Sequence, residues 1–346
     1  MARIGYALSS EEHRPSDLVR HARLAEDAGF EFALISDHFH PWLDVQGQSP
    51  FVWGVIGGIA EATTTLELGT GVTCPMIRTH PAIIAHAAAT AGAMMEGRFF
   101  LGVGTGENLN EHILGDSWPD WDVRARMLAE SVALIRELWK GEVTSWQGEF
   151  YTVENARIYT LPKQPVPIHV AASGPRAATL AGEIGDGFIG TSPDKELVAN
   201  FKRGRRAKRP SYGQLTVCWD RDEKAARRMA HRMWPTAAIP GEAGQELPNP
   251  KHFEQLAGIV TEDMVAERVV CGPDMDRHAE EIGAFIDAGY DHVYVHQVGP
   301  NQEGFLEAYA KDILPRFAGR AAGATAGRGS VTPKRSAAAK RDRSAA

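Results

Sequence analysis

The sequence has few cysteines, no long apolar run and little excess of either charge. Its three cysteines, Cys74, Cys218 and Cys271, are far apart, so they form neither a disulfide framework nor a zinc-binding spacing. No stretch of about 18 consecutive apolar residues occurs, which argues against a membrane-spanning helix. The first residues lack the basic and then apolar pattern of a signal peptide. We therefore expect a cytoplasmic location and no membrane partner.

The formal net charge of −7 is unevenly distributed along the chain. From Ala318 onward there are seven lysines and arginines and one acid, so this tail carries +6 and the remainder −13. An acidic body argues against a nucleic-acid groove, and no nucleic-acid partner is expected. The tail lacks apolar periodicity. We therefore predict a catalytic domain over residues 1–317 and a disordered basic tail over 318–346.

Strand-like apolar runs alternate with amphipathic helical stretches eight times along the chain. The predicted strands are 3–8, 32–36, 66–72, 98–104, 166–171, 187–191, 215–219 and 292–296. Several are apolar nearly throughout, as expected for a parallel sheet that is covered on both faces. This repetition predicts an α/β protein of the (β/α)8, or TIM-barrel, class, in which the chemistry occurs at the carboxyl ends of the strands.

Helix boundaries and two long connections support this organisation. Pro15 opens a helix that stops at Gly29, and a second helix is predicted over residues 123–139. Residues 141–163 are interpreted as an inserted hairpin after the fourth strand. Residues 235–262 form a Pro/Gly-rich excursion after the seventh strand. Insertions of this length often build a lid or a substrate-binding wall.

Residues 36–42 (SDHFHPW) place ionisable and aromatic side chains directly after the second predicted strand. His38 can accept a proton from a substrate hydroxyl, because histidine titrates near neutral pH. Asp37 can orient or charge-balance this histidine, and Trp42 offers a flat apolar face with one N–H donor. We interpret His40 as structural.

A His-x-His pair can also chelate zinc, as in metal-dependent barrel hydrolases. In those barrels the pair usually ends the first strand, and further ligands end later strands. Here the pair ends the second strand, and His169 lies inside a strand. A metal-dependent hydrolase therefore remains the less favoured alternative, and no metal is expected.

Two glycine-rich segments follow the third and fourth strands. Residues 69–75 (GTGVTCP) are small, which lets the backbone approach a flat ligand closely. Residues 102–110 (GVGTGENLN) do not match the dinucleotide-binding spacing, but they present Glu107 at the same edge as His38. An acid separated from a base suits the proton transfers that accompany a hydride transfer.

The fifth and sixth strands end in segments that can hold an anion or a hydroxyl. Ser173 and Arg176 lie at a predicted helix start, where backbone N–H groups favour anions. Thr191 and Lys195 follow the sixth strand and add a hydroxyl and a cation.

Together these segments resemble the luciferase-like flavin and deazaflavin superfamily, and within it the coenzyme F420-dependent glucose-6-phosphate dehydrogenase family. The resemblance covers roughly residues 3–317. It depends on residues 36–39 with 41–42, 101–107, 110–111, 171–172 with 174–175, and 185–189 with 191–192. These motifs are in the same order and spacing as in the family.

The resemblance implies a dehydrogenase that transfers hydride from a sugar or other secondary alcohol, including a sugar 6-phosphate, to oxidised F420. It implies that His38 is the base, that Trp42 packs beside the reacting centre and that Glu107 is an acid facing the cofactor. Glu11 matches a further acid of the family's substrate site. The positions that match cofactor contacts are Asp37, Gly71, Val72, Cys74, Thr105, Gly106, Asn110, Ser173, Gly174, Arg176 and Ala177, although the family usually has threonine at the position of Cys74. Gly71-Val72 matches a non-proline cis peptide of the family.

The match is weaker where the family binds phosphate. Thr191 and Arg268 fit two of the family's four phosphate-binding positions, whereas one lysine position holds Asp194, with Lys195 one residue late. The fourth position falls near Gly244. Each lost charge-assisted contact costs about 1.5–3 kcal/mol, so we expect a preference for a non-phosphorylated substrate. By analogy we expect a homodimer. An FMN-dependent monooxygenase remains an alternative, although a deazaflavin reacts poorly with oxygen, which favours a dehydrogenase.

Overall fold

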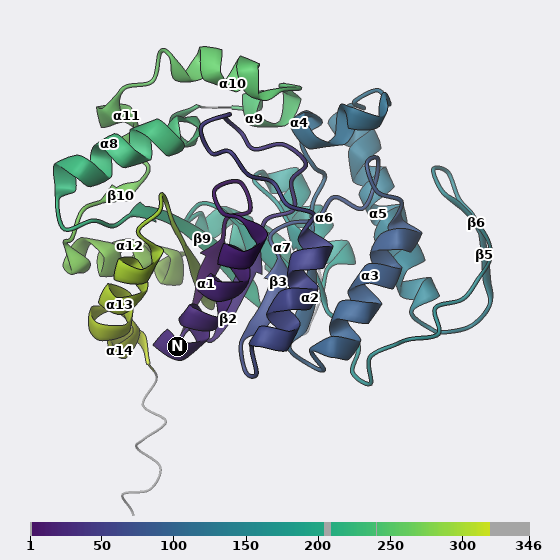
Figure 1. The fold of residues 1–346 in the computed structure, drawn as a ribbon. Coiled ribbons are helices and arrows are strands. Elements are labelled where there is room, and N and C mark those ends of the chain that lie inside the picture. Colours follow the sequence, from purple (N-terminus) through teal and green to yellow (C-terminus); the bar gives the residue numbers. More distant parts are fainter. Residues whose placement is uncertain (1, 204–208, 240, 319–346) are drawn as a thin grey trace, which may run out of the picture.

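The computed structural model describes residues 2–203, 209–239 and 241–318. Eight parallel strands close into a barrel in the order β1-β2-β3-β4-β7-β8-β9-β11, with β11 paired back to β1 (Figure 1). The strands are β1 (Arg3–Leu8), β2 (Phe32–Ile35), β3 (Glu67–Thr70), β4 (Phe99–Val103), β7 (Ile168–Ala171), β8 (Gly187–Gly190), β9 (Ser211–Cys218) and β11 (His292–Gln297). The predicted (β/α)8 barrel is confirmed.

Helices surround the barrel as this fold requires. The outer helices are α1 (Pro15–Ala28), α2 (Val52–Ala62), α3 (Pro81–Met94), α5 (Trp121–Leu138), α6 (Pro175–Ile184), α7 (Lys195–Arg203), α12 (Met275–Ala288) and α13 (Gln302–Asp312). Helix α1 begins with proline at its first position and ends at Gly29, whose φ of 95° is readily accessible only to glycine. The buried residues of α1 are Leu18, His21, Ala22 and Ala25.

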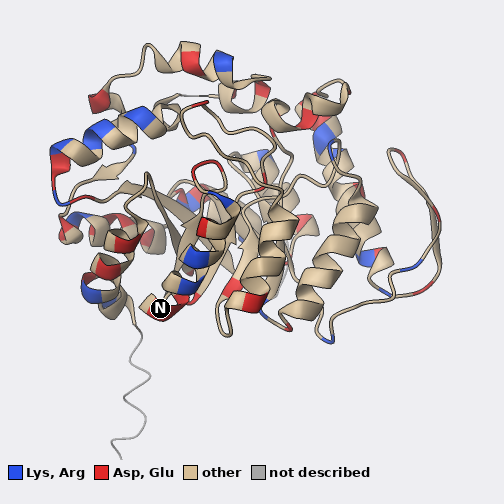
Figure 2. Ribbon diagram, viewed as in Figure 1, with Lys and Arg blue, Asp and Glu red and all other residues tan. Residues whose placement is uncertain are grey.

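Shorter elements cross the carboxyl end of the barrel. They are α4 (Asn108–Glu111), η1 (His112–Leu114), α8 (Glu223–Met233), η2 (Pro235–Ala238), α9 (Ala243–Glu246), α10 (Pro250–Ala257), α11 (Glu262–Ala266) and the two-residue strand β10 (Val270–Cys271). The short helix α14 (Leu314–Phe317) ends the described chain. Figure 1 shows α8 to α11 arching over the top of the barrel, and Figure 2 shows basic residues along α8.

The lower part of the barrel is filled by aromatic rings. Phe100 stacks on His169 at 4.5 Å between ring centroids, and Tyr212 lies 5.0 Å from His169 and stacks on His292 at 4.3 Å. Gly69 makes room for this layer, because a Cβ atom there would lie 1.9 Å from the Phe100 ring. Burial lowers the pKa of His169 to about 3, so this ring is neutral core. These rings close the amino-terminal end of the barrel. The cavity lies at the other end, where the carboxyl ends of the strands carry the predicted site residues.

Most predicted boundaries are correct to within two residues, but β9 is longer than predicted. It begins at Ser211, four residues before the predicted start, because residues 211–214 pair with β8 and β11 despite a weak apolar pattern. The predicted hairpin is present as the antiparallel pair β5 (Thr144–Gln147) and β6 (Thr152–Ala156), which projects from the barrel in Figure 1. The predicted basic tail lies, apart from Ala318, outside the described residues.

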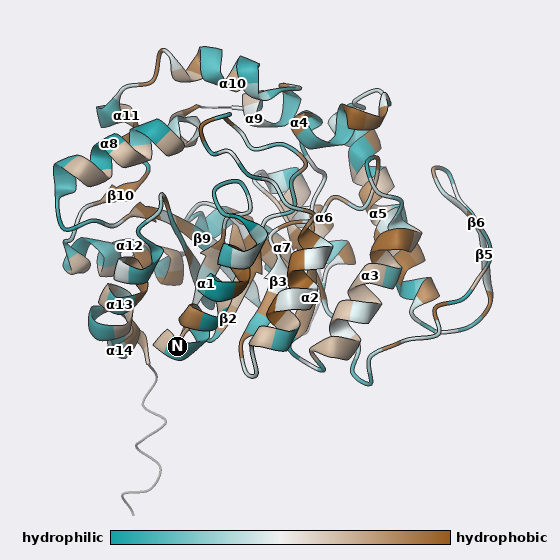
Figure 3. Cartoon of the chain, viewed as in Figure 1, coloured by the Kyte–Doolittle hydropathy of each residue, from teal (hydrophilic) through white to brown (hydrophobic). Residues whose placement is uncertain are grey.

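The main hydrophobic core contains residues of the barrel strands and of the surrounding helices, and Figure 3 shows hydrophobic residues of α2 in brown. Within the part of the chain that the structure describes, no helix is long and apolar enough to cross a membrane.

Candidate active site

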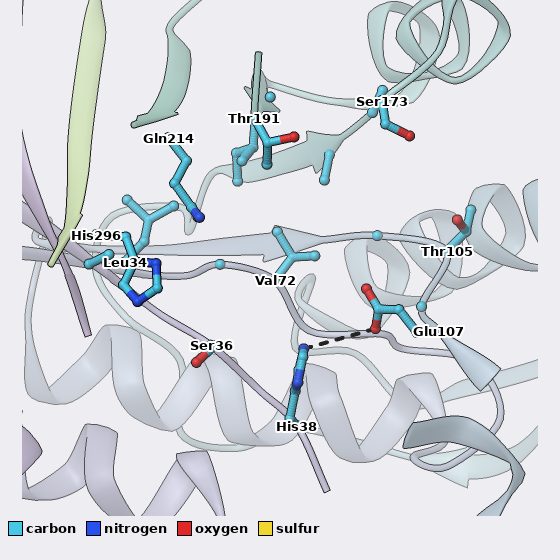
Figure 4. A pocket seen from close by; sticks show the side chains of 18 of the residues that line it. Leu34, Ser36, His38, Val72, Thr105, Glu107, Ser173, Thr191, Gln214 and His296 are labelled. Atoms are coloured by element: carbon cyan, nitrogen blue, oxygen red, sulfur yellow. Dashed lines mark ion pairs between the residues drawn. The ribbon is translucent and has the colours of Figure 1, made fainter. Parts of the chain in front are cut away.

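A cavity of about 300 Å³ opens at the carboxyl ends of the barrel strands. Eleven of the sequence-predicted residues line it: Glu11, His38, Trp42, Gly71, Val72, Thr105, Gly106, Glu107, Ser173, Ala177 and Thr191. Figure 4 shows several of their side chains converging from different strands. The fold therefore brings segments more than 150 residues apart in the sequence into one site.

His38 lies between two carboxylates. Its Nδ1 atom is 3.0 Å from Oε1 of Glu11, and its Nε2 atom is 4.0 Å from Oε2 of Glu107 (Figure 4). The Nδ1 contact is within ion-pair distance, but its angle is not that of a linear hydrogen bond, since Nδ1 has no hydrogen-bond partner. Glu11 thus acts on the ring mainly through charge, and Nε2 is the nitrogen available on the Glu107 side.

Glu11 is held in place by two serines. Its Oε2 atom accepts hydrogen bonds from Ser9 Oγ at 2.9 Å and from Ser36 Oγ at 2.8 Å, and the residue is only 2% exposed. Because β1 and β2 are neighbours, the ends of these strands bring both hydroxyls to the same carboxylate. Glu11, predicted as a substrate residue, therefore lies beside His38 in the cavity lining.

The prediction that Asp37 orients His38 is wrong. The Asp37 carboxylate accepts hydrogen bonds from Thr73 Oγ1 at 2.8 Å and from Arg78 Nη2 at 2.9 Å. Arg78 also bonds Glu111 through its backbone N–H, at 2.9 Å. Asp37 therefore faces this buried network, whereas its neighbour His38 faces the cavity.

Trp42 connects His38 to the excursion after β9. Its ring makes edge contacts with His38 at 5.2 Å and with Phe253 of α10 at 5.1 Å, centroid to centroid. Gln46 accepts from the Trp42 backbone N–H and donates to the carbonyl of Met233, both at 2.9 Å. The excursion therefore forms a wall over the site, as its length predicted.

A glycine loop after β4 gives the cavity a flat, backbone-lined side. Gly106 has a φ of 71°, and a Cβ atom there would lie 2.6 Å from Cys74 Sγ. A Cβ at Gly104 would lie 2.8 Å from a methyl group of Val72. The Gly71-Val72 peptide is cis, as the resemblance implies. Such a surface fits a planar ring system, so the residues present fit a flavin or deazaflavin.

The remaining residues predicted for the cofactor lie behind or beside this surface. Asn110 is buried, and its Oδ1 accepts the backbone N–H groups of Phe39 and His40 at 2.9 and 3.0 Å. Its Nδ2 is buried with no partner among the described residues. Burial and the nearby acids raise the pKa of the Cys74 thiol well above its ordinary value. Gly174 and Arg176 do not line the cavity.

Arg176 and the predicted phosphate contacts Lys195 and Arg268 are exposed at the surface. Arg176 pairs with Asp122, and its guanidinium lies 4.2 Å above the centroid of Trp121. Lys195 begins α7 and Arg268 follows α11, and neither lines the cavity. Among the described residues the cavity lining contains no lysine or arginine, while Glu11 and Glu107 both contribute to it.

Sequence reasoning missed several lining residues. They are Gln214, Trp234, Gln245, Tyr294 and His296, together with Trp121 and the serines behind Glu11. His296 could have been found, because it lies near the end of the eighth predicted strand, at the catalytic edge. Gln214 was hidden by the late predicted start of β9, and Gln245 belongs to an excursion without a periodic pattern.

The two histidines of the His-x-His pair have different partners. His40 Nδ1 lies 2.9 Å from the carbonyl oxygen of Leu109, whereas His38 faces Glu11. Over residues 2–203, 209–239 and 241–318, no group of three or more His, Cys, Asp or Glu side chains is arranged to hold a metal ion. The geometry thus makes His40 structural, in agreement with the sequence interpretation.

The fold and the cavity are those of a TIM-barrel protein with a binding site at the carboxyl ends of its strands. Comparison with known proteins identifies the family. Residues 1–292 match the luciferase-like monooxygenase family, and the chain belongs to this family. It is 38% identical to an F420-dependent glucose-6-phosphate dehydrogenase of Beutenbergia cavernae, over 92% of this chain and 98% of the relative. It is 40% identical to an enzyme of the same name from Nakamurella multipartita, over 91% and 96% of the two chains.

A solved structure is also similar. An F420-dependent secondary alcohol dehydrogenase in complex with an F420-acetone adduct superposes with a TM-score of 0.84 at 30% identity, covering 90% of this chain and 98% of that chain. The F420-dependent tetrahydromethanopterin reductase of Methanopyrus kandleri shares the fold with a TM-score of 0.75 at 22% identity.

Proposed function

We propose that this protein is a coenzyme F420-dependent dehydrogenase that oxidises a secondary alcohol or sugar. The observation that carries the proposal is the placement of His38 between Glu11 and Glu107, in the cavity of a barrel whose relatives are named as F420-dependent dehydrogenases. A histidine with one nitrogen facing a buried carboxylate and the other facing a cavity is arranged for general-base catalysis.

His38 would take the hydroxyl proton of the substrate at Nε2. Glu11 stabilises the imidazolium that results, because its buried carboxylate lies 3.0 Å from Nδ1. When bound, F420 supplies the two-electron acceptor that receives the hydride from the carbinol carbon. The alcohol thus loses one proton and one hydride and becomes a carbonyl compound. Glu107 borders the same space and can hold or release a proton on the cofactor side.

The flat side built by Gly71, Val72, Thr105 and Gly106 would hold the deazaflavin ring, with Ser173 and Ala177 beside it. Asp37, Cys74 and Asn110 would support this side from beneath. Gly174 and Arg176 would lie toward the rest of the cofactor. These assignments predict that F420 binds more tightly than FMN or NADP. Equilibrium titration of the protein with each cofactor tests the prediction, and a preference for FMN would favour a monooxygenase instead.

We further propose that the preferred substrate lacks a phosphate group. A dianion needs cationic partners, and the described cavity lining offers two carboxylates and no lysine or arginine. Of the predicted substrate residues only Glu11 and Thr191 line the cavity, while Lys195 and Arg268 do not. Steady-state kinetics on glucose and glucose 6-phosphate test this point. A much higher kcat/KM on the phosphate ester would contradict it.

The homodimer and the cytoplasmic location remain proposals. The buried state of all three free cysteines suits a reducing compartment. Light scattering of the purified protein tests the dimer, and a mass equal to one chain at micromolar concentration would exclude it. Fractionation of the producing cells tests the location.

A further inference from the structure

A second histidine–glutamate pair borders the cavity, away from His38. His296, near the end of β11, places Nε2 3.1 Å from Oε1 of Glu12. Trp234, which directly follows α8, donates its indole N–H to the same oxygen at 2.6 Å. The backbone N–H of Gly299 donates to the other oxygen at 2.7 Å. Both His296 and Trp234 line the cavity, whereas Glu12 lies behind them.

The environment of Glu12 fixes the role of each nitrogen of His296. Burial alone would raise the pKa of Glu12, but the hydrogen bond and charge of His296, with His13 and Trp234, lower it below the ordinary value. An ionised carboxylate only accepts hydrogen bonds, so His296 Nε2 must be the donor. The ring therefore offers Nδ1 to a ligand, and Nδ1 has no partner among the described residues.

Neighbouring side chains complete a polar wall. Gln214 of β9 projects into the cavity beside His296, and Thr191 lies near Gln214 (Figure 4). Neither side chain has a hydrogen-bond partner among the described residues. A wall with an imidazole nitrogen, an amide and a hydroxyl matches alcohol hydroxyls, which both donate and accept. Among the described residues, the lining of the cavity includes no lysine or arginine to bind an anion.

We propose that His296, positioned by Glu12, binds a second hydroxyl of the substrate together with Gln214, and so selects a polyhydroxy compound over a simple alcohol. The inference rests on the proposed dehydrogenase function and adds the substrate class. His296 and Gln214 are specificity residues in this account, and Glu12 is a positioning residue. Because Glu12 also holds Trp234, the same carboxylate connects this wall to the residue immediately before the excursion that covers the site.

Two substrates separate this role from a general structural one. Kinetics with F420 would use glucose as the polyhydroxy probe and 2-propanol as the simple secondary alcohol. His296→Phe is expected to raise the KM for glucose by about 10- to 100-fold, while kcat/KM for 2-propanol changes less than about threefold. Glu12→Gln should act in the same direction with a smaller effect. His296→Gln, which keeps a polar group, should restore part of the discrimination and guards against misfolding of the Phe variant.

The matched control is His292→Gln, on the same strand at the opposite end of the barrel. It should leave the ratio of glucose to 2-propanol activity unchanged. Equal losses on both substrates in His296→Phe would overturn the inference, as would a change of the ratio in the control. The inference would also be overturned if the wild-type protein oxidises 2-propanol but oxidises neither glucose nor any other polyol. Failure to reduce F420 with every alcohol would instead overturn the proposed function, and the inference with it.

Discussion

Replacement of Glu11 by glutamine tests whether the buried carboxylate beside His38 assists the proposed proton transfer. The substitution keeps the shape of the side chain and removes its charge. Glu11 is 2% exposed, accepts two serine hydroxyls and lies 3.0 Å from His38 Nδ1. Because both serines bind Oε2, a glutamine oxygen can keep those bonds, but the amide NH2 would then face His38.

The loss is that of a charge-assisted contact, about 1.5–3 kcal/mol, which corresponds to a fall of about 10- to 150-fold in kcat. The KM for the alcohol and the Kd for F420 should change less than about threefold, because Glu11 stabilises the imidazolium that forms during reaction. The assay is steady-state reduction of F420, with fluorescence titration of the cofactor and a thermal melt as checks on integrity.

Glu67→Gln provides the control, since this glutamate pairs with Arg3 at the other end of the barrel. It should leave kcat unchanged. If Glu11→Gln keeps more than half of the wild-type kcat with a native melting curve, His38 does not depend on this carboxylate and the proposed geometry is refuted.

Three further outcomes are expected. His38→Gln should lower kcat by about 100- to 10,000-fold with little change in F420 affinity, and kinetics at saturating cofactor check it. Gly106→Ala should destabilise the loop by about 1–3 kcal/mol and weaken F420 binding, because a φ of 71° and contact with Cys74 both oppose a Cβ; denaturation and titration measure the two effects. Burial lowers the pKa of His278 to about 4, so the unfolded chain binds the extra proton between pH 6.5 and 4. Stability should therefore fall by about 3 kcal/mol as the pH drops through that window, and His278→Gln should remove this part of the pH dependence in urea titrations; an unchanged slope would contradict it.

The sequence predicts the barrel and much of the site because both depend on local patterns. Apolar strands that alternate with amphipathic helices specify the fold, and motifs at strand ends must meet at one edge. His38 and Glu107 are therefore predictable even though 69 positions separate them. Asp37 was given the wrong role, because its preference for Thr73 and Arg78 depends on side-chain direction at a strand end.

Contacts that depend on closure of the barrel are harder to predict. Glu12 and His296 are 284 positions apart, and they meet only because β11 pairs back onto β1. No local pattern marks Glu12, which follows another glutamate in an ordinary strand-to-helix connection. The excursion that begins after Trp234 and supplies Gln245 has no periodicity from which its path could be derived.

The central claim is hydride transfer from an alcohol to F420, and isotopic transfer tests it most directly. The purified protein would be incubated with oxidised F420 and a secondary alcohol deuterated at the carbinol carbon, in the presence and absence of oxygen. The account predicts one deuterium in the reduced deazaflavin per carbonyl formed, at equal rates under both conditions. Oxygen-dependent turnover with FMN, or product formation without deuterium in F420, would contradict it.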